Sequence, residues 1–366
     1  MARRGTPAQL NALIAVDKPC GITSHDVVSR VRRAVDERRV GHAGTLDPMA
    51  SGVMVVGIGQ ATRLLGLLTL DTKSYVASIR FGAETNTDDS EGEVARTVEM
   101  DGSARSRLLD EAFARSVLER FKGTGEQVPP TFSAISVAGV RSYKRARAGE
   151  EVELPARPIR VYAADLLAVS EAPAGDGKGA GTAADDIAAS AAPGTAPASP
   201  AIEWTVSFTV SKGTYIRALA RDIGRAAGSA AHVSLLRRTA SGSVSLASCV
   251  PLEGLDADAA RRAAIDPIRA LGMPALEVGE RDLADILQGR AIRVDRLPAV
   301  PDGPGSSPAA ATAFPLAPAA GPSPATGPAP IALTHRGTLA AIARAAASGS
   351  LAMEHVFPQP IEGVRA

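Results

Sequence analysis

The most regular part of the chain is the stretch IEWTVSFTVSKGTYIRALARDIG, which covers residues 202–224. In its first nine residues apolar and polar side chains alternate strictly, a period of two that is typical of a strand with one buried face. Ser211 to Thr214 interrupt the alternation, and apolar residues then recur at helical spacing, namely Ile216, Leu219, Ala220 and Ile223. The stretch therefore predicts a half-buried strand that leads directly into a helix.

Further elements of both kinds lie upstream of this stretch. Residues 74–81 alternate and predict a second strand, which Gly82 ends. Apolar residues between Val27 and Val35 recur at helical spacing, and Thr23 with Asp26 resembles a capping box at the start of that helix. Residues 108–118 predict another amphipathic helix. Because strands and helices are mixed without regular βαβ alternation, the sequence favours the α+β class.

Length and composition indicate a reduced, soluble protein of about two domains. The chain has 366 residues, of which 45% are hydrophobic and 22% charged. Its two cysteines, Cys20 and Cys249, are too few for a disulfide framework or a four-thiolate metal site. No apolar run approaches the roughly 18 residues of a membrane span. We therefore expect a cytoplasmic protein without a membrane anchor.

Two stretches differ sharply in composition from the rest of the chain. Residues 171–200 and 301–330 consist almost entirely of Ala, Gly, Pro, Ser and Thr. Such segments bury too little apolar surface to offset their ordering entropy, so we predict that both are flexible. This divides the chain into a body of about 10–270, interrupted at 171–200, and a C-terminal domain of about 275–366, interrupted at 301–330.

Charge is unevenly distributed although the net charge is only +1. Residues 84–101 are mostly acidic among their charged positions, whereas residues 212–238 hold six basic residues and one acid. Arg217, Arg221 and Arg225 are spaced by four and should share one side of the predicted helix. This polarity would suit a polyanion bound on one side, but charge runs are also common on ordinary solvated faces.

The richest candidate for chemistry is the glycine-rich segment of residues 41–52, GHAGTLDPMASG, just before an apolar strand. Glycines permit tight turns, and Pro48 fixes the backbone immediately after Asp47. One interpretation is a loop that presents Asp47 to a substrate. The other is an aspartate that closes a turn by bonding its own backbone, and His42 alone could be structural. Signatures for nucleotide phosphates, serine nucleophiles and metal clusters are missing or incomplete, so we expect no cofactor and no metal.

This segment resembles the catalytic motif of the bacterial tRNA pseudouridine synthase B family, whose members isomerise uridine 55 in the T-loop. Other blocks resemble the family in the same order over about residues 12–270, namely 17–24 (DKPCGITS), 73–75 (KSY), 87–92 (TDDSEG), 127–134 (QVPPTFSA), 212–217 (KGTYIR) and 235–239 (LLRRT). The resemblance implies a pseudouridine-synthase fold, with a mixed, mostly antiparallel sheet and a central cleft. It also implies a small β-rich, PUA-like RNA-binding domain at the C-terminus.

The resemblance also implies roles for particular residues. Asp47 would be the essential catalytic carboxylate, Arg217 its ion-pair partner, and Tyr75 the aromatic ring that stacks on the flipped uracil. His42, Tyr215 and Leu236 match positions that contact the substrate base or its loop, and Arg237 with Arg238 are candidates for contacts to the RNA backbone. The alternative left open for Tyr75, Tyr215 and Leu236 is ordinary packing, and for Arg217 it is a phosphate contact.

The resemblance implies an enzyme that binds the T-arm of tRNA as a monomer, without an obligate protein partner. Two alternatives stay open at this point. One is an RNA-binding or tRNA-folding protein, and the other is a guide-RNA-dependent relative that shares the catalytic motif. Modification of unguided tRNA by the pure protein would separate the last of these from a stand-alone enzyme.

Overall fold

The computed structural model describes residues 10–69, 72–133, 136–137, 140–142, 145, 154–172, 200–293, 328–346 and 349–364. Described residues up to Asp71 and from Thr239 onward form one compact unit, and those from Thr72 to Arg238 form a second. The segments 171–200 and 301–330 lie almost entirely outside the described residues. The domain limits near residue 270, like the central cleft, stay predictions. None of the helices in the described stretches is long and apolar enough to cross a lipid bilayer.

The first unit opens with a sheet that carries the glycine-rich segment. β1 (Ala12–Lys18) and β3 (Ser51–Ile58) are antiparallel, β2 (Val40–Ala43) pairs antiparallel with β3, and β14 (Cys249–Pro251) runs parallel to β1. The predicted N-terminal helix is α1 (Ser24–Ala34), and its capping box of Thr23 and Asp26 is present. The other elements here are the 3-10 helices η1 (Gly59–Leu64) and η2 (Leu246–Ser248), the helices α2 (Leu65–Leu68), α7 (Ala257–Arg262) and α8 (Pro267–Leu271), and β13 (Val244–Ser245).

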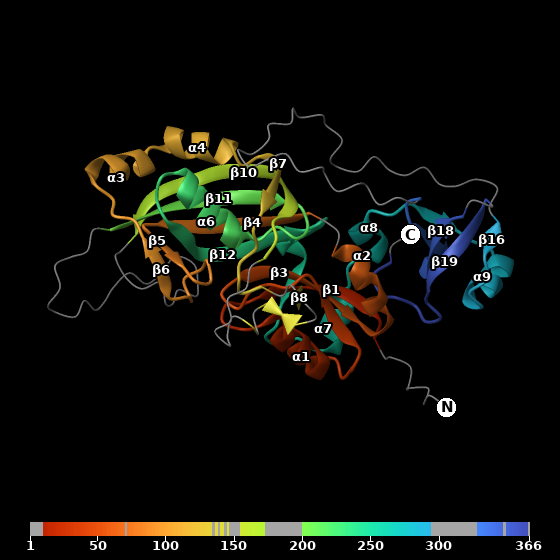
Figure 1. Ribbon diagram of the computed structural model, residues 1–366. Coiled ribbons are helices and arrows are strands. Elements are labelled where there is room, and N and C mark those ends of the chain that lie inside the picture. Colours follow the sequence, from red (N-terminus) through yellow and green to blue (C-terminus); the bar gives the residue numbers. More distant parts are fainter. Residues whose placement is uncertain are drawn as a thin grey trace. The chain divides into compact units, whose positions relative to one another are not determined.

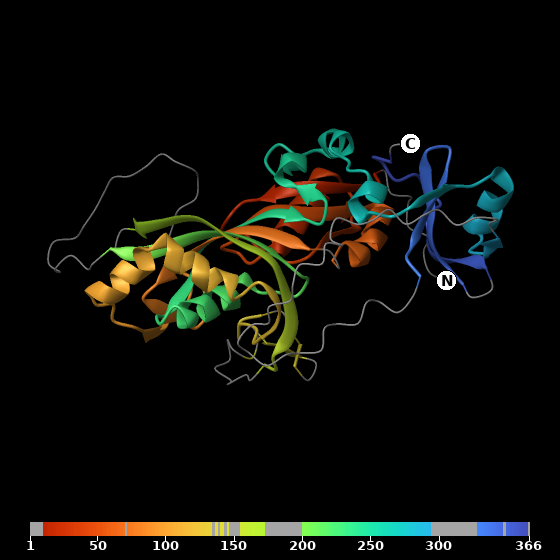
Figure 2. The same ribbon diagram turned by 90° about the horizontal axis from the view of Figure 1, so that it is seen from above.

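The C-terminal part of the first unit is a separate five-stranded sheet in the order β15-β17-β18-β19-β16, against which α9 (Glu280–Leu287) packs (Figure 2). Its strands are β15 (Ala275–Glu277), β16 (Ile292–Arg293), β17 (Ile331–His335), β18 (Thr338–Ala345) and β19 (Ser350–Val356). β15 runs parallel to β17, and the pairs β17–β18, β18–β19 and β16–β19 are antiparallel. The prediction of a small β-rich, PUA-like C-terminal domain is confirmed.

The end of the chain returns to the N-terminal sheet of the first unit. Phe357 and Ile361, each 3% exposed, belong to the same apolar cluster as Leu13 on β1. Gln359 accepts hydrogen bonds from the side chains of Asn11 and Gln60, at 3.3 and 2.7 Å. The residues after β19 therefore complete the hydrophobic core around β1 and β3.

The second unit is built on a sheet in the order β12-β4-β11-β10-β7, covered on one face by α3, α4 and α6 (Figure 1). β11 (Ala201–Val210) is antiparallel to both β4 (Lys73–Phe81) and β10 (Arg157–Ala172), and β10 is antiparallel to β7 (Gly123–Gln127). The remaining elements are β5 (Ala83–Thr85), β6 (Val94–Thr97), β8 (Ser136–Val137), β9 (Val140–Arg141), β12 (Ala231–Ser241), α3 (Gly102–Leu109), α4 (Glu111–Glu119) and α6 (Ile216–Ala226). The prediction of an α+β fold with a mixed, mostly antiparallel sheet is confirmed.

Burial follows the sequence pattern along β4 and β11, because buried and partly exposed residues alternate in both strands. Trp204 on β11 is fully buried, contacts the ring of Phe81 at a centroid distance of 4.5 Å, and donates its indole N–H to the carbonyl of Leu108 at 2.7 Å. That bond ties α3 to the sheet. The single helix predicted over 108–118 is in fact two helices, because Asp110 adopts an extended conformation and caps α4 through the amide of Ala112.

Candidate active site

Asp47 lies in the loop between β2 and β3 of the first unit. Its side chain is partly exposed, and its backbone carbonyl accepts a hydrogen bond from the amide of Ala50 at 3.1 Å. Gly44 and Gly52 bracket the loop with φ values of +81° and +105°, conformations that glycine adopts without steric cost. Asp47 thus lies in a loop between two strands, and its presentation to a substrate stays a prediction.

The end of β1 and the segment that follows it support this loop through hydrogen bonds. Lys18 is fully buried, and its ammonium donates to the carbonyls of Pro19, Ile22 and Pro48 at 2.9, 2.7 and 3.2 Å. The amide of Gly21 also donates to the carbonyl of Pro48, at 2.9 Å. Because Pro48 directly follows Asp47, these bonds restrain the backbone on the C-terminal side of the carboxylate.

The N-terminal side of Asp47 is restrained through Leu46. The hydroxyl of Ser24 donates to the Leu46 carbonyl at 3.0 Å and accepts from the Leu46 amide at 2.9 Å. Ser24 and Leu46 are 2% and 4% exposed. Sequence reasoning did not single out Ser24, although the motif that contains it was noted.

His42 lies on β2, opposite Val56 of β3, and is partly exposed. Its ring meets the ring of His25, an exposed residue of α1, edge to face with centroids 6.0 Å apart. His42 and Asp47 are therefore presented by the same end of β2 and the loop that follows it. The role of His42 as a contact to RNA stays a prediction.

The other candidates belong to the second unit. Tyr75 on β4 stands opposite Phe208 of β11 and is 9% exposed, and Leu236 on β12 is 5% exposed. Tyr215 precedes α6 as its N-cap residue, and the side-chain amide of Gln127 holds its backbone by accepting from Tyr215 N at 2.9 Å and donating to Tyr215 O at 3.0 Å. The burial of Tyr75 and Leu236 fits both the packing and the substrate-contact interpretation, whereas Tyr215 is partly exposed.

Arg217 lies in the first turn of α6 and is only 4% exposed. Its guanidinium donates to the carbonyls of Thr87 and Phe132 at 2.6 and 3.1 Å, and its Nη1 atom is 3.4 Å from a carboxylate oxygen of Asp89. Asp89 is thus a partner of Arg217 that the sequence-based assignment missed, although the 87–92 motif contains it. The expected ion pair between Arg217 and Asp47 stays a prediction.

Two of the three arginines on α6, Arg221 and Arg225, form ion pairs with residues of the acidic stretch 84–101. Arg221 donates to Asp88 at 2.9 Å, and Arg225 donates to both carboxylate oxygens of Glu84 at 3.0 and 2.7 Å. These ion pairs join the basic and acidic stretches to each other, and a contact of the row of arginines with a polyanion stays a prediction. The charge of the two arginines fixes β5, through Glu84, and the loop after it, through Asp88, to the helix.

Burial disfavours ionisation of the carboxylates in this network. It raises the pKa of Asp88 to about 6, because desolvation outweighs the attraction of Arg221 and Arg217. It also raises the pKa of Asp222, whose carboxylate accepts from Arg221 at 3.0 Å. Burial opposes ionisation of Glu84 as well, but bonds from Arg225 and Arg96 outweigh it and lower the pKa of Glu84.

The two arginines proposed for the RNA backbone differ in exposure. Arg237 on β12 is partly exposed, whereas Arg238 is 1% exposed and is among the largest fully buried side chains. A direct phosphate contact by Arg237 stays a prediction. The burial of Arg238 counts against the same role for that residue.

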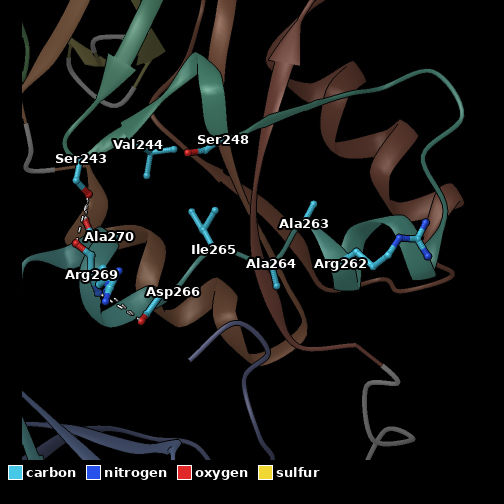
Figure 3. Close-up of a pocket in the computed structure, with 10 residues that line it drawn as sticks. All are labelled: Ser243, Val244, Ser248, Arg262, Ala263, Ala264, Ile265, Asp266, Arg269 and Ala270. Atoms are coloured by element: carbon cyan, nitrogen blue, oxygen red, sulfur yellow. Dashed lines mark hydrogen bonds and ion pairs between the residues drawn. The ribbon is translucent and has the colours of Figure 1, made fainter. Parts of the chain in front are cut away.

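No group of three His, Cys, Asp or Glu side chains in the described residues is placed to hold a metal ion. A cavity of about 340 Å³ lies in the first unit around α8, between residues 243–248 and 262–270 (Figure 3). Its one carboxylate, Asp266, caps α8 through the amides of Ile268 and Arg269, and none of the predicted site residues lines it.

Known proteins resemble this chain over most of its length. The family model for the TruB family pseudouridylate synthase N-terminal domain matches residues 32–180, and that for the tRNA pseudouridylate synthase B C-terminal domain matches residues 217–274. A tRNA pseudouridine synthase B of Mycobacteroides abscessus is 43% identical over 78% of this chain and 86% of the relative. Another, of Mycolicibacterium paratuberculosis, is 45% identical over 66% of this chain and 72% of the relative.

Among solved structures, a chain of an H/ACA ribonucleoprotein bound to a substrate RNA containing 2′-deoxyuridine is similar with a TM-score of 0.60. The two chains are 21% identical in sequence. The similarity covers 86% of that chain and 96% of this one, which shows a shared fold. Given this fold, the motif around Asp47 and the identity to the curated relatives, the chain belongs to the tRNA pseudouridine synthase B family.

Proposed function

We propose that this protein isomerises uridine to pseudouridine at position 55 in the T-loop of tRNA, with Asp47 as the essential catalytic carboxylate. The observation that carries the proposal is the loop of residues 41–52, which matches the family motif and is restrained on both sides of Asp47. The curated relatives are named as tRNA pseudouridine synthases, which supports tRNA as the substrate.

The reaction asks little of the protein beyond one positioned carboxylate. It breaks the C1′–N1 bond of the nucleotide and forms a C1′–C5 bond, with no net change in oxidation state. Addition of the carboxylate to C1′, its addition to C6 and its abstraction of the 2′ proton are three routes, and each needs the ionised form. The uracil must leave its stack, which costs a few kcal/mol.

We assign supporting roles to residues of both units. The aromatic ring of Tyr75 would stack on the extruded uracil, and the guanidinium of Arg217 would stabilise the charge of the Asp47 carboxylate. Tyr215 and Leu236 would line the uracil pocket, and His42 would contact the RNA loop beside the flipped base. Supporting these roles are the match to the family motifs and the burial of Tyr75, Leu236 and Arg217.

The substitution Asp47→Asn tests the central assignment. The amide keeps the size of the side chain but removes its ionisable carboxylate, so single turnover should be abolished while tRNA still binds. If Asp47 only closes a turn, the variant should convert uridine normally, because Asn serves turns as well as Asp does. Asp36→Asn is a matched control, because Asp36 is an exposed aspartate of the same unit with φ of +48°, a conformation that Asn tolerates.

Position-resolved mapping of pseudouridine in unmodified tRNA decides between the candidate functions. Conversion at position 55 by the pure protein is expected, and its absence beside an active reference enzyme would contradict the proposal.

We also propose that the protein acts in the cytoplasm as a monomer, without an obligate protein partner or guide RNA. Light scattering of the active preparation would test the oligomeric state, and a requirement for added guide RNA would favour the guided relative.

A further inference from the structure

The hydroxyl group of Ser24 forms hydrogen bonds with the backbone of Leu46, the residue directly before Asp47. We infer that Ser24 is a positioning residue for catalysis, which fixes the Asp47 carboxylate by clamping the backbone of the residue before it. The inference rests on the proposed role of Asp47. It assigns to Ser24 a function in the rate of the chemical step rather than in RNA binding.

The clamp consists of two hydrogen bonds between one side chain and one backbone residue. Ser24 Oγ donates to Leu46 O at 3.0 Å and accepts from Leu46 N at 2.9 Å, although the two residues are 22 positions apart. Both bonds are buried, so water cannot easily replace them. A single hydroxyl thereby satisfies both polar groups that a neighbouring strand would otherwise pair.

The clamp is anchored on a rigid element. Ser24 is the first residue of α1, directly after Thr23, and Thr23 and Asp26 form a reciprocal capping box with bonds of 3.1 and 2.8 Å. The helix start therefore has a fixed backbone, and the Ser24 side chain can aim at Leu46 from a defined position. Functional groups held by such supporting bonds are positioned more accurately than groups on unsupported loops.

Removal of the clamp would leave the loop held at Pro48 by Lys18 and Gly21, but would remove the two described bonds at Leu46, on the other side of Asp47. The loop's glycines at 44 and 52 have positive φ values, and these are the positions at which the backbone bends most easily. In a Ser24→Ala protein the amide and carbonyl of Leu46 lose these partners in a buried site, so the loop should shift to find others. Because a displacement of about 1 Å can cost about a hundredfold in rate, a small movement of Asp47 would be visible in turnover.

The experiment compares three variants of the full-length protein with the wild type. Ser24→Ala removes the clamp, Ser24→Cys keeps the shape of the side chain but weakens both bonds, and Thr23→Ala removes the helix cap while leaving the hydroxyl of Ser24. Each is assayed for single-turnover pseudouridine formation with saturating tRNA, for the Kd of tRNA, and for the midpoint of thermal unfolding.

We expect Ser24→Ala and Ser24→Cys to slow single turnover by about tenfold to a hundredfold, with the Kd within about twofold of the wild type. Thr23→Ala should lower the unfolding midpoint but slow single turnover much less than either Ser24 variant, because it leaves both bonds between Ser24 and Leu46 in place. This split between rate and affinity is not expected if Ser24 only stabilises the fold.

Two results would overturn the inference. One is wild-type turnover by either Ser24 variant, and the other is a loss of rate that Thr23→Ala reproduces at a similar unfolding midpoint. If Ser24→Ala does not fold, the nearly isosteric Ser24→Cys carries the comparison alone. Failure of the proposed function is distinguishable, because the wild-type protein itself would then form no pseudouridine at position 55.

Discussion

The buried carboxylate of Asp88 should make the second unit more stable in mild acid than at neutral pH. Asp88 is 6% exposed, and burial raises its pKa from 3.8 to about 6 despite the attraction of Arg221 and Arg217. Between these two values the folded protein binds a proton that the unfolded chain does not. The free energy of unfolding therefore rises as the pH falls through this window.

The size of the effect follows from the two pKa values. At pH 7 the Asp88 carboxylate is mostly ionised in both the folded and the unfolded protein, so the free energy of unfolding depends little on pH there. At pH 5 the folded carboxylate is mostly protonated whereas the unfolded one is mostly ionised, and the gain is about 1 kcal/mol relative to pH 7. Further acidification adds to the gain until the pH falls below the pKa of the unfolded chain.

The assay compares the wild type with Asp88→Asn by urea unfolding between pH 5 and pH 7. The chain has one tryptophan, Trp204, which is fully buried in the second unit and reports on that unit. Subtracting the variant cancels the titration of groups that do not interact with Asp88. Asp165→Asn, which removes a largely exposed carboxylate from the same unit, serves as the matched control.

A positive result is a wild-type advantage that grows by about 1 kcal/mol as the pH falls from 7 to 5, and only against Asp88→Asn. A difference that stays flat across this range would show that Asp88 remains ionised beside Arg221. A difference that shrinks with acid would mean that the ion pair outweighs burial. Either outcome would refute the reasoning.

Three further predictions test other parts of the structure. Gln127→Glu removes the donor to the Tyr215 carbonyl, so it should lower the stability of the second unit by about 1–3 kcal/mol, measured by urea unfolding with Trp204 fluorescence. Phe357→Ala should cost about 3–5 kcal/mol, because the ring is buried against the N-terminal core, and thermal unfolding followed by circular dichroism would measure it. Arg237→Glu should weaken tRNA binding and lower the slope of log affinity against log salt concentration by about one or more, measured by filter binding.

Each of these predictions has a clear contrary outcome. An unchanged urea midpoint for Gln127→Glu would mean that the carboxylate finds another arrangement at the start of α6. An unchanged melting temperature for Phe357→Ala would mean that the residues after β19 add little to the core of the first unit. An unchanged salt slope for Arg237→Glu would place that side chain away from the RNA backbone.

Much of the local structure was predictable because its causes lie close together in the sequence. Strict alternation over 202–210 becomes β11, and the capping box of Thr23 and Asp26 starts α1 as expected. Periodicity and capping depend on side chains within a few residues of one another, so a single sequence contains them. The glycine-rich segment that carries Asp47 was likewise identified from its own residues.

Contacts between distant segments depended on the tertiary structure. Ser24 clamps Leu46 from 22 positions away, Gln127 holds Tyr215 from 88 positions away, and Arg217 donates to Thr87 across 130 positions. The same is true of the pairing of Arg221 and Arg225 with Asp88 and Glu84, which the sequence offered only as two separate charged stretches. Which charge neutralises which is decided when the sheet of the second unit brings β4, β5 and α6 together, and no pattern along the chain encodes that meeting.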